Sequence, residues 1–155
     1  MTPFDAIRGV PNACQALPKL VTGGQPDKSH LEALAEAGVE VVLDLRAPQE
    51  PRPFDEPAII RRLGMAYVNI PVITTGILDD GLMERLLAEL RRHAGTPMLC
   101  HCAGGNRVGG PLIPYLILDH AFSEADAIAT ARRVGLSSPE LLAWGVEYAR
   151  RKSGR

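Results

Sequence analysis

The apolar residues of this chain form short continuous runs that alternate with segments in which apolar residues recur at helical spacing. A continuous apolar run of roughly four to eight residues is typical of a strand covered on both faces of a sheet. Four such runs predict strands: "LVTGG", "VEVVLDL", "AYVNIPV" and "TPMLC". The first begins at Leu20 and is closed by a Gly-Gly turn before Pro26.

Helices are predicted between and after these strands. The segment from Asp27 to Gly38 offers a capping aspartate, inward-facing Leu31 and Leu34, and a glycine stop. A strongly amphipathic helix is predicted after Asp80, in which Leu82, Leu86, Leu90 and His93 recur about every four residues on one face. The other predicted helices cover about 56–63, 108–121 and two stretches between 123 and 151.

Prolines limit where regular structure can form. Four prolines in "RAPQEPRPFDEP" predict a loop, because proline fixes φ and lacks an N–H donor. The helix expected from 108 to 121 contains Pro111 and Pro114. We expect both to lie near its first turn, where N–H groups have no partner within the helix.

Strands that alternate with helices predict a mostly parallel sheet with helices on both faces. The expected architecture is therefore three-layer α/β with four or five strands, in a single domain spanning 1–155. In such folds ligands bind at the carboxyl ends of strands. The stretch "HCAGGNR" occupies that position, directly after the strand "TPMLC".

Composition narrows the function classes. The 155 residues carry a formal net charge of -1, and this lack of excess positive charge argues against nucleic acid or an acidic membrane as a partner. The apolar runs are too short to span a bilayer, and the first residues lack the pattern of a secretory signal. A cytoplasmic location is expected. Three cysteines cannot all pair with one another, which favours reduced thiols.

The loop "HCAGGNR" combines a thiol, flexible backbone and a guanidinium at one strand end. Gly104 and Gly105 let the backbone curl so that consecutive N–H groups point inward, at the positive end of the following helix. Arg107 offers two parallel hydrogen bonds to an oxyanion. This positive environment should favour the thiolate of Cys102 and make it a nucleophile, with His101 orienting it or simply closing the strand. A buried structural cysteine is the competing interpretation.

The segment "HCAGGNRVGG" resembles the phosphate-binding loop of cysteine-dependent protein phosphatases, which carry His-Cys, five residues and then Arg. Together with "TGGQP", "AGVEVVLDLR" and "LGMAYVNIPV", in that order, it is similar to the bacterial beta-lactamase-hydrolase-like phosphatase family, a compact relative of dual-specificity phosphatases. The resemblance extends from about Leu20 to Leu118. It implies a dual-specificity-phosphatase-like fold, Cys102 as nucleophile and Arg107 as oxyanion clamp. The implied oxyanion cradle consists of Ala103, Gly104, Gly105, Asn106 and Arg107.

Two departures from the phosphatase pattern bear on the reaction. Only four residues separate Cys102 from Arg107, as in rhodanese sulfurtransferases, where the cysteine carries a persulfide. The Ser or Thr that usually follows the arginine is Val108, so a hydroxyl that assists the leaving thiolate is missing. The missing hydroxyl is expected to slow breakdown of a phosphocysteine, and the shorter loop is compatible with sulfur transfer instead.

The general acid is the least defined part of the predicted site. By the resemblance, an aspartate on a loop after a preceding strand protonates the leaving oxygen. The corresponding stretch "IPVITTGILDDG" offers Asp79 and Asp80, of which Asp80 is the candidate and helix capping the competing role. Asp44 also ends a strand near this edge, but a structural pair with Arg46 is expected there.

These residues predict a cysteine-dependent phosphatase that hydrolyses phosphate monoesters through a phosphocysteine. Two alternatives remain open: a sulfurtransferase using a Cys102 persulfide, and a non-catalytic oxyanion-binding module. The expected partner is a phosphorylated small molecule or peptide, or a sulfur donor. No cofactor or metal is expected, because "CHC" from Cys100 has no second ligand pair. Gln25 is expected to serve its turn and Trp144 to lie in the core.

Overall fold

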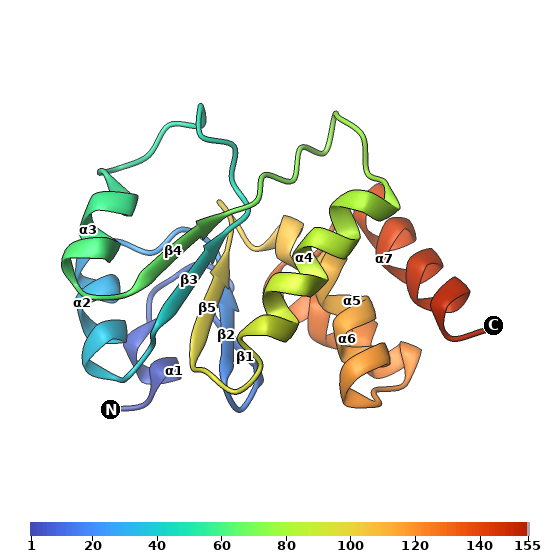
Figure 1. The fold of residues 1–155 in the computed structure, drawn as a ribbon, viewed down its shortest axis with the longest axis horizontal. Helices are drawn as coiled ribbons and strands as arrows, with labels where there is room; N and C mark the ends of the chain where they lie inside the picture. The colour runs from blue at the N-terminus through green and yellow to red at the C-terminus, as the bar shows by residue number, and fades with distance from the viewer. Residues whose placement is uncertain (155) are drawn as a thin grey trace.

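The computed structural model describes residues 1–154, which surround a five-stranded sheet with the order β1-β2-β5-β3-β4 (Figure 1). All neighbouring strands are parallel except β1 and β2. The four strands expected from apolar runs are confirmed, whereas β1 was not predicted. The strands are β1 (Cys14–Leu17), β2 (Leu20–Gly23), β3 (Val41–Asp44), β4 (Ala66–Asn69) and β5 (Met98–His101).

Side-chain caps determine where most of the helices begin. The helices are α1 (Pro3–Ala6), α2 (Lys28–Glu36), α3 (Glu56–Arg62), α4 (Asp80–Arg92), α5 (Asn106–His120), α6 (Glu124–Val134) and α7 (Pro139–Lys152). Asp27, Asp79 and Ser123 each accept an N–H from the first turn of α2, α4 and α6. These bonds satisfy donors that have no partner inside the helix.

The helices cover both faces of the sheet, with α1 to α3 on one face and α4 to α7 on the other (Figure 1). Alternate residues of each strand point to opposite faces, and each face has its own apolar core. Val42 and Leu99 pack toward Leu31 and Ile60 of α2 and α3. The larger core lies on the other face and includes Trp144, as expected. The predicted three-layer α/β fold is therefore confirmed.

Helix α5 is the central element of the larger core and contacts α4, α6 and α7. It begins at Asn106, so Pro111 and Pro114 lie inside it, and their expected position near the first turn is wrong. Because proline has no N–H, the carbonyl groups of Arg107 and Gly110 lose a helical hydrogen bond. Burial of α5 among the neighbouring helices compensates for these losses, since packing stabilises a helix more than its intrinsic propensity does.

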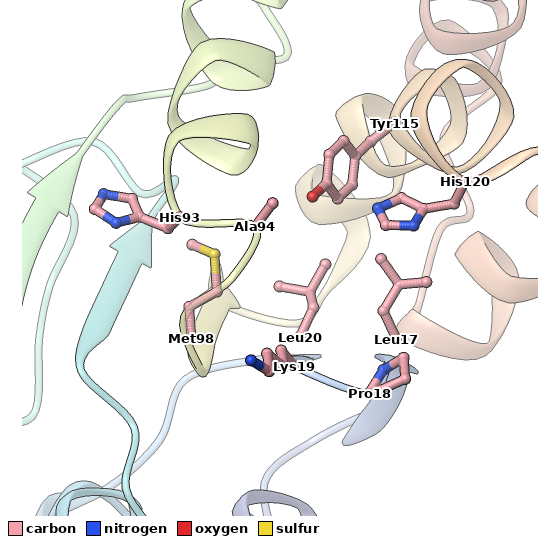
Figure 2. A pocket seen from close by; sticks show the side chains of 9 residues that line it. All are labelled: Leu17, Pro18, Lys19, Leu20, His93, Ala94, Met98, Tyr115 and His120. Atoms are coloured by element: carbon pink, nitrogen blue, oxygen red, sulfur yellow. The ribbon is translucent and has the colours of Figure 1, made fainter.

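The two ends of the strands in the sheet have different surroundings. The carboxyl ends of β3, β4 and β5 lie at one edge, beneath the loops that join β3 to α3 and β4 to α4 (Figure 1). At the opposite edge, the β1–β2 turn and the ends of α4 and α5 enclose a cavity of about 310 Å³ (Figure 2). Leu17, Leu20 and Met98 line this cavity together with His93, Tyr115 and His120, and none of its lining residues belongs to the loop that carries Cys102.

Among residues 1–154, no helix combines the length and the apolar character that crossing a bilayer requires.

The crossing of α5 and α7 gives a prediction about stability. A Cβ added at Gly145 would lie 2.4 Å from the carbonyl oxygen of Gly110 on the facing helix. Alanine improves helix propensity by about 1 kcal/mol, but overpacking costs about 1–3 kcal/mol. We expect Gly145→Ala to lower the free energy of unfolding by about 1–2 kcal/mol, measured by urea denaturation.

The matched control is Gly95→Ala, because a Cβ at Gly95 meets no atom within 4 Å. This variant should stay within about 0.5 kcal/mol of the parent protein. Equal stability of both variants would mean that the two helices can separate without cost.

Candidate active site

Strand β5 carries Cys102 to the carboxyl edge of the sheet. In register, His101 lies between Gly23 of β2 and Asp44 of β3. The N–H of Cys102 then donates to the carbonyl oxygen of Gly23 at 3.3 Å, which continues the ladder one residue beyond β5. Cys102 is buried at this point, and the chain turns from it into α5.

The loop after Cys102 is held by its outward-facing carbonyl groups. The Ala103 carbonyl accepts the main-chain N–H of Gln25 at 2.9 Å, and the Gly104 carbonyl accepts the Asn12 side-chain amide at 2.7 Å. In a trans peptide the N–H points opposite to the C=O. The N–H groups that follow these two carbonyls therefore point inward, and that of Gly105 donates to Cys102 Sγ at 3.1 Å.

Glycine is required at only one of the two central loop positions. Gly105 has φ +96°, and a Cβ there would lie 1.8 Å from the carbonyl oxygen of Val134. At Gly104 a Cβ would meet no atom within 4 Å. The close approach of the loop to the end of α6 therefore depends on Gly105.

Arg107 is held beside Cys102 by a carboxylate from the loop between β3 and α3. Its two terminal nitrogens donate to the two oxygens of Glu50 at 2.6 and 2.9 Å. This pairing and the nearby Cys102 raise the pKa of Arg107. In return, the hydrogen bonds from Arg107 lower the pKa of Glu50 to about 2, despite its partial burial.

His101 lies behind the loop in a fully buried ion pair. Its Nε2 is 2.5 Å from Oε2 of Glu56, and its Nδ1 is 3.2 Å from the carbonyl oxygen of Cys102. Burial opposes charge on both groups, but their mutual attraction outweighs it. It raises the pKa of His101 and lowers that of Glu56. The charged imidazole of this neutral pair therefore lies against the backbone of Cys102.

Asp44 belongs to the same buried cluster, where it has one arginine partner beyond the one expected. The Arg46 main-chain N–H donates to it at 2.9 Å, but the guanidinium that pairs with it, also at 2.9 Å, is that of Arg52. The expected pairing of Asp44 with Arg46 is therefore made through the Arg46 main chain, and Arg52 supplies the guanidinium. The Tyr67 hydroxyl donates to the same carboxylate at 2.7 Å. These bonds, together with complete burial, give Asp44 a structural role.

Among residues 1–154, one cluster could offer three ligand atoms to a metal: Asp44, Glu56 and His101, within 4.8 Å of one another. Glu56 is bonded to His101, and Asp44 accepts three protein donors. Protein donors thus fill the positions a metal ion would need, and the cluster does not fit one.

Gln25 is part of the site, although its sequence position suggested only a turn. Its side-chain Nε2 donates to Glu56 at 2.5 Å, and its Oε1 accepts Nη1 of Arg46. Its position in the sequence could have indicated this role, because Gln25 closely follows the carboxyl end of β2, and Cys102 follows the carboxyl end of the neighbouring strand β5. Glu50 and Glu56 were missed for a similar reason, since they belong to a proline-rich loop and the helix after it.

The two candidate acids occupy the beginning of α4. Asp79 caps the helix by accepting the N–H of Leu82 at 2.9 Å, so its competing structural role is confirmed. Asp80 is half exposed and pairs with Arg151 of α7 at 2.6 Å. The structure brings Cys102 and Arg107 together, while the Asp80 carboxylate is bound to a different element.

Two further residues of the loop face the protein rather than the site. The side-chain oxygen of Asn106 accepts the N–H groups of Ser137 and Ser138 at 2.8 and 3.2 Å. Asn106 therefore contributes only its backbone to the predicted cradle. Val108 is buried in the larger core.

Comparison with known proteins identifies the family. Residues 18–145 match the profile of the family described as "Swiss Army Knife protein, DSP-PTPase phosphatase domain". A beta-lactamase hydrolase-like protein of Xylella fastidiosa is 30% identical over 95 residues. The match covers 57% of this chain and 21% of that protein, so the chain corresponds to about a fifth of its relative.

Solved structures show the same fold at lower sequence identity. A DUF442 protein from Shewanella putrefaciens CN-32 has a TM-score of 0.82 and 24% identity, over 98% of this chain and 99% of that one. A variant of TpbA from P. aeruginosa, solved in complex with pTyr, has a TM-score of 0.69 and 19% identity, over 90% and 83%. At these identities the likeness establishes the fold alone.

The loop geometry predicts different effects for its two glycines. Gly105→Ala adds a methyl group against Val134 at a left-handed backbone position. We expect it to lower the free energy of unfolding by more than about 2 kcal/mol. Gly104→Ala, the matched control, should change it by less than about 1 kcal/mol. Thermal and urea unfolding measure both, and the reverse ranking would contradict this loop conformation.

The Glu50–Arg107 pair predicts how stability responds to acid. The pKa of Glu50 is lowered from 4.5 to about 2, so the stability the pair contributes is complete above about pH 4.5 and is lost as pH falls toward 2. Glu50→Gln should be less stable at neutral pH and should lose less stability than the parent between about pH 5 and 3.

Urea unfolding at the two pH values measures this difference. Exposed Glu32 provides the control, because Glu32→Gln should follow the parent protein at both. An identical acid response of Glu50→Gln and the parent would show that the pair does not form in solution.

Proposed function

Because the chain belongs to the DSP-PTPase phosphatase domain family, we propose that it hydrolyses phosphate monoesters with Cys102 as the nucleophile. The observation that carries this proposal is the convergence of three groups at one strand end. The sulfur of Cys102 accepts the N–H of Gly105, and the guanidinium of Arg107 lies beside it. Inward N–H groups and a guanidinium suit the oxygens of a phosphoryl group.

In the proposed reaction the thiolate attacks phosphorus and the bond from phosphorus to the leaving oxygen breaks. The electron pair of that bond goes to the leaving oxygen, and the phosphoryl group is now carried by Cys102. Water then attacks the phosphocysteine, which releases inorganic phosphate and restores the thiolate. Arg107 has five N–H donors, two of which bond to Glu50 while the side chain also faces Cys102. The N–H groups that are not bonded to Glu50 are the donors we assign to the equatorial oxygens.

The substrate class follows from the leaving group. Asp80 remains the proposed general acid, but it must leave Arg151 before it can protonate a leaving oxygen. Aryl phosphates need this proton least, because phenolate is a better leaving group than alkoxide. We infer that phosphotyrosine-like substrates react faster than alkyl phosphates, which agrees with a fold neighbour that binds pTyr.

We expect the protein to release phosphate from para-nitrophenyl phosphate and Cys102→Ser to lose all measurable turnover. Arg107→Lys should lower kcat/KM by about 10²-fold or more, because lysine cannot make the same planar contacts. Cys14→Ala is the control, since Cys14 is buried on β1 and should not affect turnover. The measurement is phosphate release under steady-state conditions.

Two other outcomes would replace the proposal. Transfer of sulfur from thiosulfate to cyanide without phosphate release would favour the sulfurtransferase, whose short loop this chain shares. Binding of inorganic phosphate with no turnover of either substrate, unchanged in Cys102→Ser, would favour the binding module.

A further inference from the structure

Gln25 makes three hydrogen bonds that converge on the candidate site. Its main-chain N–H donates to the carbonyl of Ala103, within the loop itself. Its side chain is partly buried and bonds to Glu56 on one side and Arg46 on the other. The Asp44 carboxylate also links the cluster behind the nucleophile to the cluster behind the oxyanion clamp, through the Arg46 main-chain N–H at 2.9 Å and His101 Nε2 at 4.0 Å. Among the side chains named in the site, only that of Gln25 bonds both to Glu56 and to the Arg46 guanidinium.

The partners fix the orientation of the Gln25 amide. A guanidinium can only donate, so the atom that faces Arg46 must be the oxygen. A carboxylate can only accept, so the atom that faces Glu56 must be the nitrogen. A residue that only accepts or only donates at this position can therefore keep one of the two bonds but not both.

One arm of the network leads from Gln25 to the nucleophile. Glu56 accepts from Gln25 through Oε1 and pairs with His101 through Oε2, both at 2.5 Å. His101 in turn reaches the carbonyl oxygen of Cys102. The arm thus determines the position of the imidazole behind Cys102.

The other arm leads from Gln25 to the oxyanion clamp. Arg46 donates to Gln25, and its Nε lies 3.6 Å from Oε1 of Glu50. The same Glu50 oxygen accepts Nη2 of Arg107 at 2.9 Å. Glu50 also accepts the Ala47 main-chain N–H at 2.6 Å, so the arm and this bond together position the carboxylate that holds Arg107.

We propose that Gln25 is a positioning residue that couples the two halves of the site, so that the ionisation of Cys102 and the anion affinity of Arg107 depend on the same side chain. The proposal extends the proposed function to a residue that touches neither substrate nor sulfur. Buried hydrogen-bond networks act as units, because one missing partner leaves others unsatisfied.

The charged groups that face His101 must be considered in any pH measurement. Glu56 pairs with it directly, and the carboxylate of Asp44 lies 4.0 Å away on β3. Arg52 pairs with Asp44 and offsets its charge. Since none of these groups bonds to the Gln25 side chain except Glu56, a change at Gln25 acts on His101 through Glu56.

The test uses Gln25→Met, which removes the side-chain bonds to Glu56 and Arg46, together with a local bond from Nε2 to the Pro26 carbonyl at 3.0 Å. It keeps the main-chain bond to Ala103 and retains an unbranched side chain. Two properties are measured on folded protein. The first is the pH midpoint of thiolate formation, from ultraviolet absorbance with Cys102→Ser as baseline. The second is the Kd of inorganic phosphate, from calorimetry. Gln15→Met is the matched control, because Gln15 is exposed on β1.

We expect the thiolate midpoint of Gln25→Met to rise by roughly half a pH unit or more and phosphate to bind about tenfold more weakly. A change in only one property would refute the coupling. Unchanged midpoint and Kd, with or without a lower Tm, would leave Gln25 as a turn residue and overturn the proposal.

If Gln25→Met does not fold, the same thiolate midpoint is measured on Gln25→Glu. Glutamate still accepts from Arg46 but opposes Glu56, so the thiolate midpoint should rise, and an unchanged midpoint would overturn the proposal. Neither readout requires turnover. A parent protein that releases no phosphate from para-nitrophenyl phosphate would therefore refute the proposed function and still leave the role of Gln25 decided.

Discussion

The outward orientation of two carbonyl groups is the constraint on which the candidate site depends. Because peptide groups are planar and trans, turning the Ala103 and Gly104 carbonyls away from Cys102 turns the following N–H groups toward it. The backbone of Gln25 and the side chain of Asn12 hold the carbonyls in place. The contact between Gly105 and the sulfur follows from this geometry.

Charge in and behind the loop is balanced rather than simply positive. The sequence suggested a positive cup around Cys102, but Glu50 binds Arg107 and Glu56 binds His101. Buried charges are tolerated when they are paired and hydrogen-bonded. In the proposed reaction a phosphoryl group would meet an arginine that a carboxylate already orients, which reduces the entropy lost on binding.

Sequence patterns predicted the elements that bury a continuous apolar run. The strands before Asp44 and Cys102 were of this kind, and the fold class followed from their alternation with helices. Strand β1 was not predicted, because its four residues lie at the sheet edge and only Cys14 is fully buried. The position of Pro111 and Pro114 was misjudged, because the tertiary burial that lets α5 begin at Asn106 has no local signal.

The site was predictable only where its parts are adjacent in the chain. Cys102 and Arg107 share one loop, so their types and spacing were sufficient. Gln25, Glu50 and Glu56 come from other segments, and spacing cannot tell which loop returns to a strand end. The same limit applies to the acid, since the pairing of Asp80 with a residue of α7 depends on how distant helices pack.

The loop around Cys102 is assembled from anchors far apart in the chain. Asn12 holds Gly104 across 92 positions, and Asn106 accepts N–H groups from the link between α6 and α7. An unfolded chain cannot present this ring of donors, so an oxyanion that binds as proposed would bind the native state alone. Such binding would raise the free energy of unfolding of the whole chain in proportion to the logarithm of anion concentration, once the site is saturated.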